Sequence, residues 1–230
     1  LAVGTLAGDT NQGNYATAVG LEAGQTSQGV SAIAVGHAAG ETNQGQTALA
    51  VGYTAGRNAQ GTDAVAIGVS AGQTSQGTNS IAIGRHAGIT SQGTNTLAVG
   101  NQAGSGDQGN NSVAVGVNAA RISQGVSAVA IGDQAGYNTQ RNNAVAVGHE
   151  SGCNAQGGNA TAVGYLAGQT SQGDNSVAVG VNAGSNAQGT SATAVGRSAG
   201  LDAQGANTVA VGYTAGRTSQ GANAVAMGYQ

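Results

Sequence analysis

The chain has 230 residues, a formal net charge of −3, 43 glycines, and no proline, phenylalanine or tryptophan. One Met, no Phe and few Leu give too little bulk to close a globular core. The six basic residues are all arginine, so the chain lacks the positive charge that holds phosphates, which excludes nucleic acid as a partner. Ala, Val and Ile at fixed positions exclude a disordered chain.

A single repeat of 16 residues runs from one end of the sequence to the other. Each copy closes on the glycine that follows Ala-Val or Ala-Ile, with Ala-Met in the last copy. A fixed period of this kind is typical of a repeat array. We therefore predict one array over residues 1–230 with no separate domains. The closing glycines stand, without one insertion, at 4, 20, 36, 52, 68, 84, 100, 116, 132, 148, 164, 180, 196, 212 and 228.

Each copy contains two turn signals and two strand signals. Counted from the closing glycine as position 0, a copy reads G-x-x-A-G-x-[TN]-[SNA]-Q-G-x-[NST]-[AST]-[VIL]-A-[VI], as in residues 68–83. Glycines at positions 0, 4 and 9 predict two bends, because glycine takes a positive φ at no cost. Positions 6–8 predict a short polar strand, and the alternation at positions 12–15 predicts the main strand. Stacked copies predict an all-β parallel β-solenoid of about 14–15 coils, with 16 residues per coil.

Large aliphatic residues or Met occupy 27 of the 30 places at positions 13 and 15 of the main strand, the exceptions being Thr17, Thr161 and Thr193, whereas position 14 is Ala in every copy. The polar strand offers no apolar partners, so we predict that small residues fill a thin interior and that the aliphatic stripe faces outward. Burying a large apolar side chain stabilises a protein by roughly 1.5–3 kcal/mol, and a stripe left in water loses this stabilisation at each residue. We therefore expect a second chain to pack against the stripe. A thicker monomeric coil with the stripe inside is the alternative. The expected interface includes Val65, Ile67, Ile81, Ile83, Val113, Val115, Val129, Ile131, Val177 and Val179.

The sequence N-S-[VI]-A-[VI]-G-x-x-A, at residues 79–87 and again from Asn111 and Asn175, resembles the head repeat of trimeric autotransporter adhesins. The resemblance covers the whole chain and implies a YadA-like head, a left-handed parallel β-roll with three chains around an aliphatic centre. Similar repeats occur in surface fibre proteins of phages and large viruses. This chain differs in its strict period and in lacking the neck, stalk and anchor. Because it begins at Leu1 in mid-repeat and ends at Gln230, we expect a segment of a longer fibre or a unit that continues end to end.

Glutamine occupies position 8 in all fourteen full copies. A polar binding surface is one interpretation, but a ligand site seldom needs fourteen copies. We therefore predict a structural ladder in which each amide hydrogen-bonds its copy in the next coil. Its members are Gln12, Gln28, Gln44, Gln60, Gln76, Gln92, Gln108, Gln124, Gln140, Gln156, Gln172, Gln188, Gln204 and Gln220.

No catalytic, cofactor or metal site is predicted. The string at residues 104–109 matches G-x-G-x-x-G, but its outer glycines are ordinary repeat glycines and no helix pattern follows. His37, His86 and His149 lie three or more coils apart, so no two of them could share a metal ion. Cys153 stands at position 5 beside a turn, where we expect it to be exposed. No apolar run is long enough for membrane insertion.

Positions 1, 2 and 5 carry most of the charged and tyrosine side chains and so predict the outward surface. We interpret the chain as a structural and adhesive rod, a head or fibre segment of a trimeric adhesin on a bacterial outer membrane or a virion. It would attach to a host-cell or matrix protein or glycan. The residues expected on the adhesive surface are Glu22, Tyr53, Arg57, Arg85, Tyr137, Tyr165, Tyr213 and Arg217.

Two other functions remain open from the sequence. A passive, self-assembling fibre or virion spacer is the first alternative. Ice binding is the second, because a row of Thr on a flat solenoid face could order water. Thr occupies position 6 in seven of fourteen copies, and Gly106, Ile122 and Asp202 interrupt that row.

Overall fold

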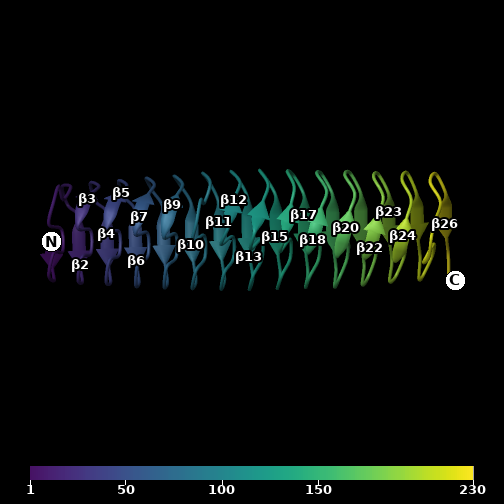
Figure 1. Cartoon of the computed structure of the whole chain (residues 1–230), viewed down its shortest axis with the longest axis horizontal. Helices are drawn as coiled ribbons and strands as arrows, with labels where there is room; N and C mark the ends of the chain where they lie inside the picture. The colour runs from purple at the N-terminus through teal and green to yellow at the C-terminus, as the bar shows by residue number, and fades with distance from the viewer. Residues whose placement is uncertain (230) are drawn as a thin grey trace. The chain divides into compact units, whose positions relative to one another are not determined.

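The computed structural model describes residues 1–229, and in those residues it contains 26 short strands and no helix. Contacts divide the chain into two compact units, Leu1–Val115 and Gly116–Gln230. Each unit is a stretch of parallel β-solenoid in which two sheets alternate along the chain (Figure 1). The predicted all-β parallel β-solenoid, with about 14 coils of about 16 residues, is confirmed.

In the first unit the main strands form one sheet and the shorter polar strands a second. Gln92 lies between strands of the second sheet and forms two single-residue bridges, one to Gln76 and one to Gln108 of β12 (Asp107–Gln108). The other strands of the second sheet are β3 (Thr26–Gln28), β5 (Thr42–Gln44), β7 (Asn58–Gln60) and β9 (Thr74–Gln76). The first sheet contains β1 (Ala2–Val3), β2 (Thr17–Val19), β4 (Ile33–Val35), β6 (Leu49–Val51), β8 (Val65–Ile67), β10 (Ile81–Ile83), β11 (Leu97–Val99) and β13 (Val113–Val115).

The second unit repeats this arrangement. Its second sheet consists of β14 (Ser123–Gln124), β16 (Thr139–Gln140), β18 (Asn154–Gln156), β20 (Thr170–Gln172), β22 (Asn186–Gln188) and β24 (Asp202–Gln204). Its first sheet consists of β15 (Val129–Ile131), β17 (Val145–Val147), β19 (Thr161–Val163), β21 (Val177–Val179), β23 (Thr193–Val195), β25 (Val209–Val211) and β26 (Val225–Met227).

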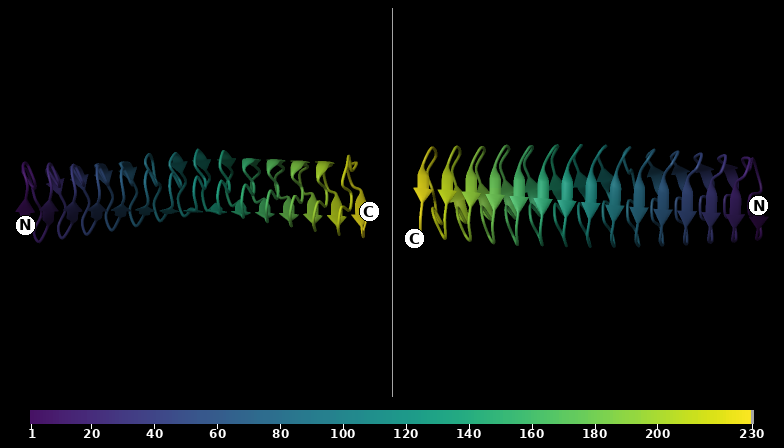
Figure 2. Two further views of the ribbon diagram at one scale, coloured as in Figure 1. Left: turned by 90° about the horizontal axis from the view of Figure 1, so that it is seen from below. Right: turned by 180° about the vertical axis from the view of Figure 1, so that it is seen from behind.

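Neighbouring strands within a unit are parallel and pair residues one repeat apart. Ile81 of β10 lies opposite Leu97 of β11, and Ile83 lies opposite Val99. Figure 2 shows the first-sheet arrows of each unit pointing the same way. Because the register equals the repeat length, every residue lies beside its own copy in the next coil. Rows of equivalent side chains therefore run from coil to coil within each unit.

Alanine fills the interior of the coils. The Ala residues at position 14 are fully buried from Ala18 to Ala210, whereas their neighbours on the same strand face outward, as at Ile33 and Val35, 41% and 36% exposed. From the second sheet, Gln44 Nε2 donates to the carbonyl of Ile33 in the first sheet at 2.8 Å, so the two sheets lie on opposite sides of this interior. The predicted small-residue interior is confirmed, and the alternative with the stripe inside is wrong.

The turns differ from the prediction at one glycine. Gly20 and Gly24, at positions 0 and 4, have positive φ of 131° and 52°, as expected. Gly29 at position 9 does not have a positive φ. Glycine is needed there because a Cβ would lie 2.5 Å from the backbone of Gly45 in the next coil. Non-glycine residues at positions 2, 7 and 11 instead take positive φ, so the coil has more corners than the two bends predicted. Glycine content alone does not reveal those corners.

Candidate functional site

The aliphatic stripe of the first sheet forms two apolar rows on the outer face of each unit. In the first unit Ile83 pairs in register with Ile67 and with Val99, which gives an unbroken row at position 15. Of the ten residues expected in an interface, Ile83, Ile131 and Val179 are 36–41% exposed and the other seven are half-buried. The structure thus brings the predicted interface residues together on the surface of each unit.

The position 8 glutamines lie in the interior and hydrogen-bond from coil to coil, except that Gln92 Oε1 has no partner within residues 1–229. Gln156 accepts from Gln140 Nε2 at 3.1 Å and donates to Gln172 Oε1 at 3.1 Å. Its Nε2 also donates to the carbonyls of Val145 at 2.7 Å and Ala160 at 3.3 Å. From Gln28 to Gln204 these side chains are at most 3% exposed, so this part of the row cannot serve as a binding surface.

The tyrosines and histidines at position 1 stack along the edge of each unit. The rings of His37 and Tyr53 lie 5.0 Å apart and nearly parallel, and those of His149 and Tyr165 lie 5.2 Å apart. Stacking covers the ring faces between neighbours and leaves the ring edges outward. Tyr53 and Tyr165 remain 56% and 49% exposed. The expected residues Arg85 and Tyr213 also lie exposed in this position 1 row, and the half-buried Glu22 follows at position 2 of its coil.

At position 5 two of the expected contact residues, Arg57 and Tyr137, are bonded to their neighbours in the row. Arg57 Nε donates to Glu41 Oε2 at 2.5 Å, and this hydrogen bond and the charge of Glu41 raise the pKa of Arg57. Arg121 Nη1 donates to the Tyr137 hydroxyl at 2.5 Å. Arg217 is exposed in the same row. Some of the charged side chains on this face are therefore bonded to neighbouring side chains of the same chain.

The expectation that Cys153 is exposed is wrong. Its side chain is 6% exposed, and burial, with a smaller contribution from the charge of Glu150, raises the pKa of the thiol to about 11. Short side chains at position 5, such as Cys153 and Ser185, are buried, whereas long ones such as Arg217 reach solvent. The depth of a side chain at this corner therefore depends on its length.

Residues 1–229 contain neither a metal-binding cluster nor a helix of membrane-spanning length. No group of three His, Cys, Asp or Glu side chains in that range could hold a metal ion. No helix in that range is long and apolar enough to cross a membrane. The G-x-G-x-x-G string at residues 104–109 contains the strand β12, and the strand β13 follows it rather than a helix.

One surface feature was not found from the sequence, although the repeat signals it. Position 9 is glycine in thirteen of the fourteen full copies, and the exception is Arg141. Its backbone N–H donates to the carbonyl of Gln156 at 3.1 Å, against 2.7 Å for Gly125 and 2.8 Å for Gly157 at the same place in their coils. The arginine Cβ is thus accommodated by a slight lengthening of this backbone hydrogen bond between coils.

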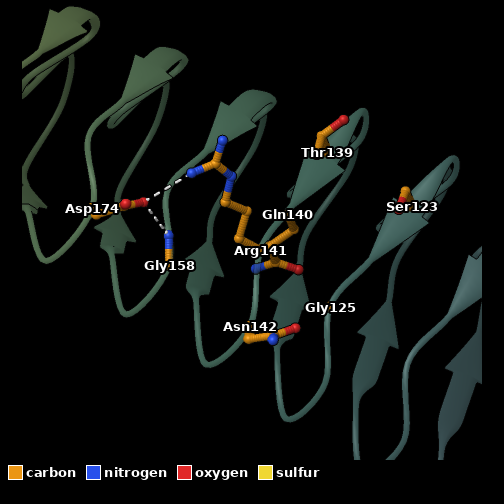
Figure 3. A pocket seen from close by; sticks show the side chains of 8 residues that line it. All are labelled: Ser123, Gly125, Thr139, Gln140, Arg141, Asn142, Gly158 and Asp174. Atoms are coloured by element: carbon orange, nitrogen blue, oxygen red, sulfur yellow. Dashed lines mark hydrogen bonds and ion pairs between the residues drawn. The ribbon is translucent and has the colours of Figure 1, made fainter.

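Arg141 lies between two shallow depressions of about 380 and 390 Å³ on the outer face of the second sheet (Figure 3). Its Nη1 donates to Asp174 Oδ1 at 3.2 Å, two coils further on. The same oxygen accepts from the backbone N–H of Gly158 at 2.8 Å. The first depression is lined by Ser123, Gly125, Thr139, Gln140, Arg141, Asn142, Gly158 and Asp174.

Comparison with protein families identifies one match. The model described as YadA head domain repeat (2 copies) matches residues 59–87, 91–119, 171–199 and 203–230, which is half of the chain. No curated protein sequence matches the chain.

Proposed function

The chain belongs to the YadA head domain repeat family, and from this premise we propose that it is an adhesive segment of a surface-exposed attachment protein and acts as a homotrimer. Its fold and family are of the structural, adhesin type. Three copies pack along the aliphatic stripe, and the outward rows at positions 1, 2 and 5 contact a host-cell or matrix protein or glycan. The segment is exposed outside the cell, on a bacterial or virion surface.

The observation that carries this proposal is the aliphatic stripe. Apolar rows as continuous as the one through Ile67, Ile83 and Val99 are rare on soluble monomers and mark contact surfaces. No charged or amide side chain occurs in the stripe in either unit. This composition favours an interface between chains that excludes water. Three copies around one axis bury these rows while leaving the second sheet of each chain outward.

The outward rows support attachment rather than assembly alone. They hold exposed aromatic and charged side chains, including Tyr53, Arg85, Tyr165 and Tyr213. Tyrosine and arginine are enriched among residues that dominate protein contacts. Because equivalent residues recur along each unit and in three chains, many weak contacts act together and give avidity without a deep pocket.

The test compares adhesion and assembly in the same samples. Beads coated with the protein are measured for retention on host cells and matrix proteins, and sedimentation gives the oligomeric state. A variant with Tyr53, Tyr165 and Tyr213 changed to Ser should remain trimeric and lose most retention. The control changes exposed valines at position 10, Val30 and Val126, to Ser and should be retained like the wild type.

The other functions give different results. Trimers that no host surface retains above a blank would indicate a spacer. Thermal hysteresis and faceted ice growth would instead indicate ice binding through the Thr row, in which Thr26, Thr42 and Thr74 lie on β3, β5 and β9 with Asn58 between them. A folded, sedimenting monomer would contradict the trimer.

A further inference from the structure

We infer that the depressions beside Arg141 form a binding site for a neutral sugar residue. The inference rests on the proposed function, because attachment to a cell surface brings the protein against glycans, and it names the chemistry that one site recognises. The site is unique in the array, since Arg141 is the one residue that replaces the position 9 glycine. A site that occurs once in the chain fits a specific ligand better than a row that recurs in every coil.

The charges in the site select a neutral ligand. Arg141 and Asp174 are the only charged side chains that line either depression among the residues described, and they form an ion pair at 3.2 Å. Their side chains are 66% and 49% exposed, so both charges are accessible to a ligand. Because the two opposite charges are paired, the site has no net charge, so anions such as phosphate, sulfate and sialic acid and cations such as polyamines gain no net electrostatic attraction there. A ligand with many hydroxyl groups and no charge suits both.

The polar groups are fixed by the backbone before a ligand arrives. Asn142 Oδ1 accepts from the backbone N–H of Val126 at 2.9 Å, and Asp174 Oδ1 accepts from that of Gly158 at 2.8 Å. Each anchored side chain has a second polar atom, Asn142 Nδ2 and Asp174 Oδ2, that has no hydrogen-bond partner within residues 1–229. Groups held in place in this way lose little conformational freedom on binding.

These atoms alternate between donors and acceptors. Asn142 Nδ2 and the remaining N–H groups of Arg141 donate, Asp174 Oδ2 accepts, and the exposed Thr139 hydroxyl does either. Sugar hydroxyls on adjacent carbons also both donate and accept, so a pair of them can bind an amide and a carboxylate at once. Figure 3 shows Thr139, Arg141 and Asn142 on one coil, with Asp174 on a coil beyond it.

An extended peptide is the main alternative occupant, and the strands disfavour it. A peptide that binds as an added strand needs a free sheet edge. Here β16 pairs with β14 and β18, and β18 pairs with β20, so no edge is free at the depressions. The lining also lacks large apolar side chains that would hold peptide side chains.

The site stays open in the proposed trimer. The second sheet faces away from the aliphatic stripe across the alanine interior, as the bonds from Gln140 of β16 to the carbonyl of Val129 in β15 show. Three chains would therefore present three copies of the site outward. Shallow sites bind single sugars weakly, and three copies on one particle raise the apparent affinity.

The experiment is a glycan array that carries neutral, sialylated and sulfated glycans, probed with the wild type and with Arg141→Gly. That variant restores the repeat residue, so its fold should be intact. We expect binding to neutral glycans, with at least a tenfold loss in Arg141→Gly and a similar loss in Asp174→Asn. Asp63→Asn, which removes an exposed carboxylate outside positions 1, 2 and 5, is the matched control for Asp174→Asn and should bind like the wild type.

Several results would overturn the inference. These are binding to no glycan, binding to charged glycans only, equal binding by Arg141→Gly, or displacement by peptides and not by free sugar. Bead retention separates this inference from the proposed function. Retention on cells without neutral-glycan binding overturns the sugar site alone. Arg141-dependent glycan binding without retention on any host surface supports the site and contradicts host attachment.

Discussion

Replacing Gln156 tests whether the buried amides or the apolar contacts hold the coils together. Gln156 is fully buried, and its side chain contacts two other amides and two backbone carbonyls. In Gln156→Met the side-chain volume is kept but the hydrogen bonds are lost. Gln172 Oε1 then loses the donor that Gln156 supplies, and a buried polar atom without a partner costs about 1–3 kcal/mol. In Gln156→Ala a cavity adds to this, giving about 3–5 kcal/mol.

The two backbone carbonyls contribute less to this cost. The Ala160 carbonyl still accepts from the backbone N–H of Val145 at 2.8 Å after the amide is removed. A carbonyl has two lone pairs, so the loss of its second bond costs less than the loss of its only bond. The amide-to-amide bond is therefore the larger polar contribution.

The assay is urea unfolding followed by circular dichroism at one protein concentration, because the stability of an oligomer depends on concentration. Hydrogen exchange of the amides near Gln156 shows whether the loss is local, as expected when each coil contacts only its neighbours. The control is Gln25→Ala at position 5, where the glutamine is only half-buried. If Gln156→Met were as stable as this control, the ladder would contribute nothing to stability, and the reasoning would be refuted.

Three further predictions concern other positions. Changing both Val113 and Val115 to Asn should dissociate or unfold the trimer, because buried amides would find no partner; a stable trimer on sedimentation would contradict the proposed interface. Gly157→Ala should lower the free energy of unfolding, measured in urea, by about 1–3 kcal/mol, because the new Cβ would lie 2.5 Å from backbone atoms of the next coil. In the control Gly158→Ala the nearest atom would be 3.7 Å from the new Cβ, so the free energy of unfolding should hardly change. Burial raises the pKa of Cys153 from 9.0 to about 11, so the folded protein favours the neutral thiol. The contribution of Cys153 to the free energy of unfolding should therefore be complete below pH 9 and be lost as the pH rises through 11, and Cys153→Ala should lack this pH dependence.

The sequence predicts the strands and the register because the fold repeats a single local pattern. Alternation at positions 12–15 indicates which side chains share a face, and the Ala row indicates a thin interior. The second role of the glutamines, bonding to carbonyls of the opposite sheet, depends on the distance between sheets, which no local pattern encodes. The corners at positions 2, 7 and 11 were missed because Asn, Ser and Thr there look like ordinary polar residues.

The sequence also failed where the repeat is broken. Cys153 occupies a position that holds Arg or Gln in six of the fourteen full copies, so composition indicates the surface, although a short side chain there is buried. Arg141 could have been noticed as the exception to a glycine row, but its partner Asp174 lies 33 residues further along the chain. Only the stacking of coils brings these two side chains together.

The equality of register and repeat length has a genetic consequence. Removing or duplicating 16 consecutive residues leaves each glutamine opposite another glutamine and each alanine opposite another alanine. Unequal recombination between the DNA segments that encode neighbouring copies would therefore shorten or lengthen the protein by whole coils without disturbing the fold. A deletion of 15 or 17 residues would instead shift the register by one residue, which places the small residues of the repeat beside the aliphatic stripe and no longer pairs glutamine with glutamine. Lineages of such a gene should differ in length by multiples of 48 nucleotides, three for each residue of a coil.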